Sequence, residues 1–231
     1  MSNELIQKLK RKLIVSCQAE GDSPFNSPEG VTMFAKAAII GGAAAIRSEG
    51  IAKTKMIIDQ TNVPVIGLVK SKFEDGSVRI TGCFRDVEDL ISIGTHIIAI
   101  DGTFRLRENL SGPDFINKVK SEFDCLVMAD IAKEDEAIEC AEAGADLIST
   151  TLNGYTPETL QDKIKSPNFD LVKSIVDKIK IPVIAEGRIN TPDDAGKMIE
   201  LGAFAVVVGT AITRPHIITG WFVDAINKTY K

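Results

Sequence analysis

The stretch that decides the fold is residues 181–215, IPVIAEGRINTPDDAGKMIELGAFAVVVGTAITRP. It begins with an apolar run at residues 181–185. TPDD at residues 191–194 then supplies a helix N-cap, a proline suited to the first helical turn and acids for the positive helix end. Residues 204–208 form a second apolar run without alternation, as expected for a strand covered on both faces. The stretch therefore predicts two parallel strands joined by a helix.

The same strand–helix unit recurs along the chain. Glycine turns followed by apolar runs occur in SIGTHIIAID, EAGADLIST and ELGAFAVVVG, and eight such units fit the 231 residues. Regular alternation predicts parallel strands with right-handed crossovers, and eight units close into a barrel. The alternative is an open doubly wound sheet, which would normally place Gly-x-Gly-x-x-Gly after its first strand, where this chain has SCQAE at residues 16–20.

We therefore predict the α/β class and a single (β/α)8 TIM barrel of the phosphate-binding type over residues 1–231. A lead-in helix is expected within residues 1–12. The expected strands are residues 13–17, 43–46, 63–69, 97–100, 126–129, 147–150, 181–185 and 204–208, and a brief extended piece is expected at residues 78–81.

The composition narrows the classes of partner. The chain has 27 basic and 32 acidic residues, a net charge of −5, which disfavours a general nucleic-acid or membrane surface. No apolar run reaches the roughly 18 residues that a membrane-spanning helix needs, and no signal peptide pattern begins the chain. Four widely spaced cysteines and two histidines suggest neither a disulfide framework nor a zinc site. We expect a cytoplasmic protein.

Polar residues follow the predicted strands at the end where barrel enzymes carry their active sites. They are Gln18, Arg47, Lys70, Asp101, Asp130, Thr150, Thr151, Glu186, Arg188, Gly209, Thr210 and Arg214. Alternation along the strands directs Lys70, Asp130 and Glu186 inward. Small residues followed by an arginine and a proline-started helix, after the last strand, predict an anion pocket.

Eight short segments at these strand ends carry a resemblance to a known family. They are IVSCQ at 14–18, AIR at 45–47, VIGLVK at 65–70, AIDGT at 99–103, MAD at 128–130, TTLNGYT at 150–156, AEGR at 185–188 and AITR at 211–214. In this order they resemble the signature segments of the N-acetylmannosamine-6-phosphate 2-epimerases. The resemblance implies an isomerase of sialic acid catabolism that interconverts N-acetylmannosamine 6-phosphate and N-acetylglucosamine 6-phosphate with no cofactor and no metal.

The resemblance also implies roles for particular residues. Lys70 becomes the catalytic acid/base and Glu186 its carboxylate partner. Gln18, Arg47 and Asp130 surround the substrate, and the loop ahead of Arg214 binds the phosphate. We add Thr151 and Arg188 to the expected substrate contacts, and Gly187, Gly209 and Thr210 to the expected phosphate contacts. The chain departs from the family after the lysine, where Ser71-Lys72 stands in place of a frequent Arg-Asp.

Inversion at C2 next to a C1 aldehyde requires that a proton be taken from C2 and one returned to the opposite face. A lysine serves as the base only if its pKa lies well below the usual value of about 10.4. Desolvation and the cations Arg47 and Lys72 act in that direction, whereas a carboxylate at Glu186 acts against it. Neither histidine is well placed as the base, because His96 precedes a strand at the barrel floor and His216 falls in the last helix.

Three other functions fit parts of the pattern. In a Schiff-base aldolase or synthase, Lys70 would attack the substrate carbonyl instead of the C2 proton. A phosphosugar-binding protein without catalysis would need only the phosphate pocket. A barrel enzyme of tryptophan or histidine biosynthesis would share that pocket but usually relies on paired carboxylates, whereas the first strand here ends at Gln18. We expect a homodimer that binds a small phosphosugar, and neither nucleic acid nor membranes.

Overall fold

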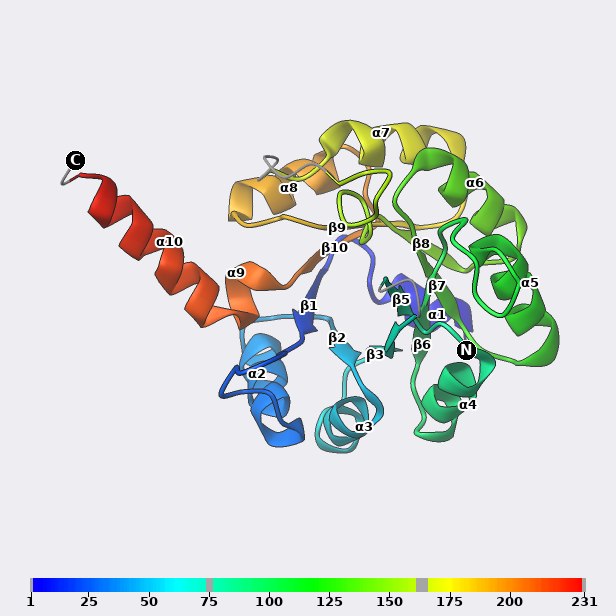
Figure 1. The fold of residues 1–231 in the computed structure, drawn as a ribbon, viewed down its shortest axis with the longest axis horizontal. Helices are drawn as coiled ribbons and strands as arrows, with labels where there is room; N and C mark the ends of the chain where they lie inside the picture. The colour runs from blue at the N-terminus through cyan, green and yellow to red at the C-terminus, as the bar shows by residue number, and fades with distance from the viewer. Residues whose placement is uncertain (1, 74–76, 161–165, 230–231) are drawn as a thin grey trace.

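The structure is a computed structural model that describes residues 2–73, 77–160 and 166–229. In these residues, parallel strands form a closed barrel in the order β1-β10-β9-β8-β7-β6-β3-β2. They are β1 (Leu13–Cys17), β2 (Ala45–Glu49), β3 (Val65–Leu68), β6 (Ile97–Asp101), β7 (Val127–Asp130), β8 (Leu147–Ser149), β9 (Val183–Glu186) and β10 (Ala205–Val208). Helices surround the barrel (Figure 1). The predicted (β/α)8 TIM barrel is confirmed.

Seven helices of the described residues lie between the barrel strands, and four of them begin at a side-chain cap. They are α2 (Pro28–Ile40), α3 (Ile51–Gln60), α4 (Phe84–Ser92), α5 (Gly112–Glu122), α6 (Glu134–Glu142), α7 (Phe169–Lys178) and α8 (Pro192–Glu200). The Ser27 hydroxyl accepts a hydrogen bond from the Gly30 N–H at 3.0 Å. Thr191 caps α8 in the same way, at 3.1 Å from the Asp194 N–H. Such caps satisfy N–H groups that the helix itself leaves without partners.

The core has two layers, one inside the barrel and one between the barrel and the helices. Ile14, Ile66, Met128, Ile184 and Val207 belong to the inner layer, and each is at most 1% exposed. Burial of each large aliphatic side chain contributes roughly 1.5–3 kcal/mol. Alternate residues on each strand face the outer layer, so the strands are apolar on both faces.

A short N-terminal helix, α1 (Ser2–Gln7), closes the barrel at the end opposite the strand C-termini. Ile6 and Leu9 pack into the inner layer, and Leu9 is completely buried. The Arg11 N–H donates to the carbonyl oxygen of Phe204 at 2.6 Å, which ties this segment to the start of β10. The structure thus has a helix within the predicted lead-in segment.

Two strand boundaries differ from the sequence prediction in ways that affect the site. We predicted a strand at 43–46, but β2 runs to Glu49, so Arg47 lies inside the strand beside Ser16 of β1 and Ile66 of β3. Its charge is accommodated by partners from other strands, which no local pattern reveals. The remaining barrel strands begin or end within two residues of the predicted limits, the usual uncertainty of strand ends.

The predicted strand at 63–69 is also wrong at its end. β3 stops at Leu68, and Lys70 begins β4 (Lys70–Lys72), which pairs antiparallel with β5 (Val78–Ile80). The Val69 N–H donates to the Thr81 hydroxyl at 3.3 Å, and the Thr81 N–H donates to the Val69 carbonyl at 2.6 Å. Lys70 is therefore not an extension of the barrel strand but the first residue of a hairpin over the mouth.

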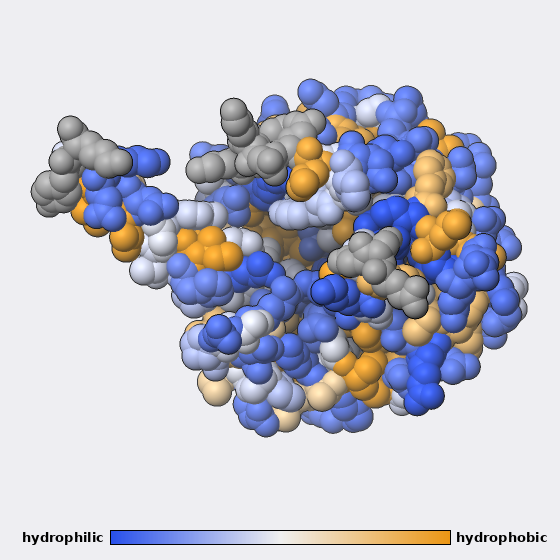
Figure 2. All heavy atoms as spheres, viewed as in Figure 1, coloured by the Kyte–Doolittle hydropathy of each residue, from blue (hydrophilic) through white to orange (hydrophobic). Residues whose placement is uncertain are grey.

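The last two helices, α9 (Thr210–Thr213) and α10 (Pro215–Lys228), follow β10. α10 projects away from the barrel (Figure 1), and none of its residues is buried. Phe222 is 66% exposed and Ile226 57% exposed, and Trp221 and Val223 are exposed beside them. Hydrophobic side chains show on this helix in Figure 2. Among the described residues, no helix combines the length and the hydropathy that a bilayer span requires.

Candidate active site

A cavity of about 680 Å³ opens at the C-terminal ends of the barrel strands. Most of the predicted site residues line it, namely Gln18, Arg47, Lys70, Thr151, Glu186, Gly187, Arg188, Gly209, Thr210 and Arg214. Because these residues come from β2 and β9 and from segments that follow β1, β3, β8, β9 and β10, only closure of the barrel brings them together. The volume suits one small polar molecule.

The floor of this cavity holds a buried ionic group of one arginine and two carboxyls. Arg47 donates from its two terminal nitrogens to Asp130, at 3.0 Å and 2.5 Å, and its NH1 lies 3.3 Å from Oε2 of Glu186. Arg47 is 1% exposed, Asp130 is completely buried and Glu186 is 12% exposed. The two parallel contacts fix the guanidinium plane, as bidentate arginine–carboxylate pairs do.

Asp130 does not line the cavity, although we predicted it as a substrate contact. It lies behind Arg47, at the end of β7, and it also accepts a hydrogen bond from the Thr151 hydroxyl at 2.7 Å. The same hydroxyl lies 3.0 Å from Oε2 of Glu186. Thr151 thus joins the two carboxyls, and Asp130 acts on the site by holding Arg47 and Thr151 in place.

The electrostatics of this group favour a proton on its two carboxyls, Asp130 and Glu186. Burial raises the pKa of Asp130 above its ordinary value, although Arg47 opposes the shift. Burial also raises the pKa of Glu186; Arg47 opposes this shift, and the neighbouring Asp130 adds to it. One cation thus faces two carboxyls in a site shielded from water. The pair therefore takes up a proton at a higher pH than two solvated carboxyls would.

Lys70 reaches the cavity from the hairpin, but its carboxylate partner differs from the predicted one. Its ammonium forms an ion pair with Glu20, a residue of the turn after β1, whereas Glu186 is engaged by Arg47. The Lys70 side chain is 30% exposed. Glu20 and Glu186 both line the cavity with Lys70. Lys70 and Glu186 therefore share the cavity, but each forms its ion pair with a different residue.

Arg214 and the start of α9 form the side of the cavity where we predicted the phosphate. Arg214 NH2 lies 3.6 Å from Oε1 of Glu20. Gly209 precedes α9, and a Cβ at this glycine would meet the Ser16 Cβ at 3.3 Å, so the backbone passes close to β1. The first N–H groups of a helix have no acceptor within it, which makes such a turn suitable for an anion.

Gln18 sits at the rim of the same side. Its amide donates to the Ser16 hydroxyl at 2.9 Å, and the Thr213 hydroxyl donates to the Ser16 carbonyl at 2.8 Å. The Thr213 bond links β1 to α9, the two segments that border the predicted phosphate position.

Arg188 was predicted as a substrate contact, but its guanidinium binds to other groups of the protein. Its terminal nitrogens donate to the carbonyls of Asn153 and Gly154, each at 3.0 Å, and the group stacks on the Tyr155 ring at 4.7 Å. A Cβ at Gly154 would lie 1.8 Å from an Arg188 nitrogen and would displace the guanidinium, and the φ of +80 at this position also favours glycine. Arg188 lines the cavity, but its hydrogen bonds and its contact with Tyr155 order the loop after β8. Gly187 has φ +111, which turns the chain at the end of β9.

Two charged residues that line the cavity were missed from the sequence. Glu20 stands two positions past Gln18 in a turn that carried no recognised motif. Arg105 lines the cavity and is held by Asp101 at 2.7 Å and by the Thr103 hydroxyl at 2.9 Å. The charged loop after β6 was visible in the sequence, but the direction of its arginines was not. Asp101 was predicted at the mouth, but it is completely buried and forms ion pairs with Arg105 and Arg107.

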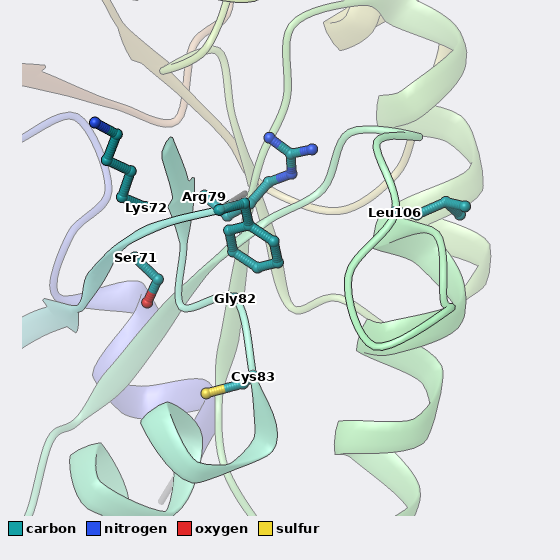
Figure 3. A pocket seen from close by; sticks show the side chains of 7 residues that line it. Ser71, Lys72, Arg79, Gly82, Cys83 and Leu106 are labelled. Carbon is teal, nitrogen blue, oxygen red and sulfur yellow. The ribbon is translucent and has the colours of Figure 1, made fainter. Parts of the chain in front are cut away.

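A second cavity of about 510 Å³ lies beside the hairpin, lined by Ser71, Lys72, Phe73, Arg79, Gly82, Cys83 and Leu106. Figure 3 shows the Lys72 ammonium and the Cys83 thiol on different sides of it. Lys72 lines this second cavity, whereas Lys70 lines the first. In the described residues, no group of three His, Cys, Asp or Glu side chains could hold a metal ion.

Comparison with known proteins places this geometry in a family. The family model described as "Putative N-acetylmannosamine-6-phosphate epimerase" matches residues 31–228. A protein of Clostridioides difficile named "Putative N-acetylmannosamine-6-phosphate 2-epimerase" is 45% identical over 96% of this chain and 99% of its own. One of the same name from Caldanaerobacter subterraneus is 44% identical over 99% of this chain and 96% of its own.

Comparison with solved structures leads to the same family. The N-acetylmannosamine-6-phosphate 2-epimerase from Clostridium perfringens superposes with a TM-score of 0.89 at 40% identity, over 96% of both chains. A thiamine phosphate pyrophosphorylase from Pyrococcus furiosus, at 17% identity and a TM-score of 0.62, shares the fold alone. The similarity to the epimerases extends over nearly the whole chain. The chain belongs to the N-acetylmannosamine-6-phosphate epimerase family.

Proposed function

We propose that this protein is a carbohydrate epimerase that interconverts N-acetylmannosamine 6-phosphate and N-acetylglucosamine 6-phosphate. The observation that carries the proposal is one cavity with a lysine at its mouth, a buried Arg47–Asp130–Glu186 group at its floor and a helix start with Arg214 at its side. The names of the relatives favour this reaction over a Schiff-base aldolase, a binding protein or a biosynthetic barrel enzyme.

In this proposal, Lys70 takes the proton from C2 of the open-chain sugar. The electron pair of the C–H bond moves into the C1 carbonyl and leaves an enolate. Arg47, fixed by Asp130, stabilises the negative oxygen as a charge placed before the reaction begins. A proton then returns to the opposite face of C2. No oxidant or reductant is needed, because the substrate and the product are isomers.

The remaining predicted residues take binding roles. Arg214, Thr210, Gly209 and Gly187 bind the phosphate, since helix N–H groups and an arginine are the usual partners of a phosphate. Gln18 and Thr151 contact the sugar, and Arg188 keeps the loop after β8 in place around it. Glu186 tunes and positions the reacting groups through Arg47 and Thr151. We propose that residues 1–231 act as one barrel unit.

Deuterium incorporation at C2 in D2O tests the reaction. The wild-type protein should exchange the C2 proton of both hexosamine phosphates and interconvert them. Lys70→Ala should lose exchange and epimerisation by at least about 10³-fold, since an acid/base group commonly supplies 10²–10⁴. It should still bind phosphosugar, because the phosphate contacts lie away from C2. Lys72→Ala, from the neighbouring cavity, is the matched control and should keep its rate.

Borohydride separates the proton-transfer role from a Schiff base. If Lys70 formed an imine, borohydride would reduce it and inactivate the wild type in the presence of substrate. Exchange without such trapping supports the base. Trapping of the wild type, or continued exchange by Lys70→Ala, would remove Lys70 from the role proposed here.

We also propose a homodimer in the cytoplasm. The support for a dimer is α10, whose exposed Trp221, Phe222, Val223 and Ile226 form an apolar face of the kind that marks protein interfaces. A second copy of the chain is the partner that is always present with it, and most soluble oligomers pair identical chains. The cytoplasm is supported by four free cysteines, as expected of a reducing compartment.

A further inference from the structure

One carboxylate oxygen in the cavity contacts two cations that the proposed reaction needs separately. Oε1 of Glu20 forms the ion pair with the Lys70 ammonium, and the same atom lies 3.6 Å from NH2 of Arg214. Glu20 belongs to the turn after β1, and its side chain is 46% exposed. It therefore has room to move away from both cations without disturbing the buried Arg47–Asp130–Glu186 group.

The charges around Glu20 come from three separate elements. Lys70 lies on β4, Arg214 follows α9, and Lys53 of α3 donates to the Ala19 carbonyl at 3.1 Å while it pairs with Glu49 at 3.3 Å. Burial opposes ionisation of Glu20, but Lys70, Arg214 and Lys53 together hold its pKa below the ordinary value. Glu20 is therefore a carboxylate at neutral pH and competes with any other anion for these cations.

The substrate would bring such an anion. A phosphate at Arg214 and a carboxylate on the same guanidinium repel each other, and the phosphate carries the larger charge. Lys70, while it is paired with Glu20, is also not free to approach C2. Both requirements are met when Glu20 leaves Arg214 and Lys70 together.

We propose that Glu20 is a positioning residue that holds Lys70 in the ligand-free protein, and that the substrate's phosphate displaces it from Arg214 and so releases Lys70. This inference rests on the proposed function. Once released, the Lys70 side chain is free to turn toward C2 of the sugar. The phosphate thus does more than bind, because a part of the substrate that does not react prepares the reacting group.

The first test measures KM. Glu20→Gln keeps the shape and removes the competing charge, so the KM for N-acetylmannosamine 6-phosphate should fall about two- to fivefold, the factor that an exposed ion pair supplies. Glu49, the carboxylate partner of Lys53, lies outside the cavity. Glu49→Gln therefore removes one negative charge away from the cavity and should leave KM unchanged. Thermal unfolding confirms that both variants are folded. A KM that is equal in Glu20→Gln and the wild type would contradict the competition.

The second test separates the phosphate from the sugar. With N-acetylmannosamine, which lacks the phosphate, wild-type C2 exchange should rise at least about fivefold when inorganic phosphate is added, because the phosphate releases Lys70. Glu20→Gln should exchange faster than the wild type without phosphate and should gain less than about twofold from it. Glu49→Gln should show the full wild-type stimulation.

The outcomes distinguish this inference from the proposed function. Equal stimulation of the wild type and Glu20→Gln, or a wild type that epimerises the phosphosugar but gains nothing from phosphate, would overturn the role of Glu20 alone. A wild type that exchanges no C2 proton even with the phosphosugar would overturn the proposed reaction first.

Discussion

Arg47 is the residue on which the charge balance of the site depends. It is 1% exposed and carries the only positive charge in direct contact with both Asp130 and Glu186 in the described part of the chain. Removal of Arg47 would leave two carboxyls buried without a cation, a loss that costs about 3–5 kcal/mol for a single buried pair. The group is therefore suited to probing by its carboxyls rather than by its arginine.

We expect Glu186→Gln to lower kcat by roughly two to four orders of magnitude, the span usual for groups that tune proton transfer, and to shift the pH profile of kcat. C2 exchange measured from pH 5 to 9 checks both results. Glu142→Gln, at the end of α6 and outside the cavity, serves as the control. A variant with the wild-type rate and profile would make Glu186 purely structural.

The same substitution has a consequence for stability. Burial raises the pKa values of Asp130 and Glu186, so the folded protein holds a proton at a pH where the unfolded chain has lost it. Unfolding then releases protons, and the free energy of unfolding falls as the pH rises from the ordinary carboxyl range near about 4 through the raised values. Glu186→Gln should flatten this fall in urea denaturation measured across that window.

At the scale of elements, the N-terminal segment closes the barrel at the end opposite the strand C-termini, and the β4–β5 hairpin carries Lys70 over the cavity. Leu9→Ala should lower the free energy of unfolding by about 2–5 kcal/mol, because a completely buried leucine leaves a cavity when it is truncated. Leu9 lies at the opposite end of the barrel from the cavity, so KM and kcat should stay within about twofold of the wild type. Urea denaturation and C2 exchange measure the two effects.

Gln7→Ala is the control for that prediction. Gln7 is exposed on α1, and its truncation should change the free energy of unfolding by less than about 0.5 kcal/mol. An active but unstable Leu9 variant would show that the N-terminal segment contributes packing alone. Loss of kcat in a folded Leu9→Ala protein would instead show that packing of the N-terminal segment affects the active site.

At the scale of the whole molecule, α10 is the feature that a single barrel leaves unexplained. We expect the wild type to be a dimer in multi-angle light scattering and Phe222→Glu to dissociate it at micromolar concentration, because a charge at a desolvated interface loses its hydration. Asn227→Glu adds the same charge at a polar position of the helix and should remain dimeric. A monomeric wild type would contradict the dimer.

Much of the barrel could be predicted from the sequence, because local rules decide it. Apolar runs without alternation are typical of buried strands, and Thr191 with Pro192 supplies the N-cap and first residue of α8. Strand ends were less certain. The end of β3 at Leu68 depends on Thr81, whose hydroxyl also donates to the Ala99 carbonyl at 2.7 Å, and no rule on neighbouring residues reveals that bond.

By itself, the sequence determined the fold class, the order of the barrel strands and most of the polar residues that gather at the mouth, because all parallel strands of a barrel end on the same side. Only the tertiary structure decided their partners. It paired Lys70 with Glu20 rather than Glu186, placed Asp130 behind Arg47 and turned Arg188 toward the carbonyls of its neighbouring loop. The physical reason is that long charged side chains can reach several partners, and burial and distance between strands choose among them.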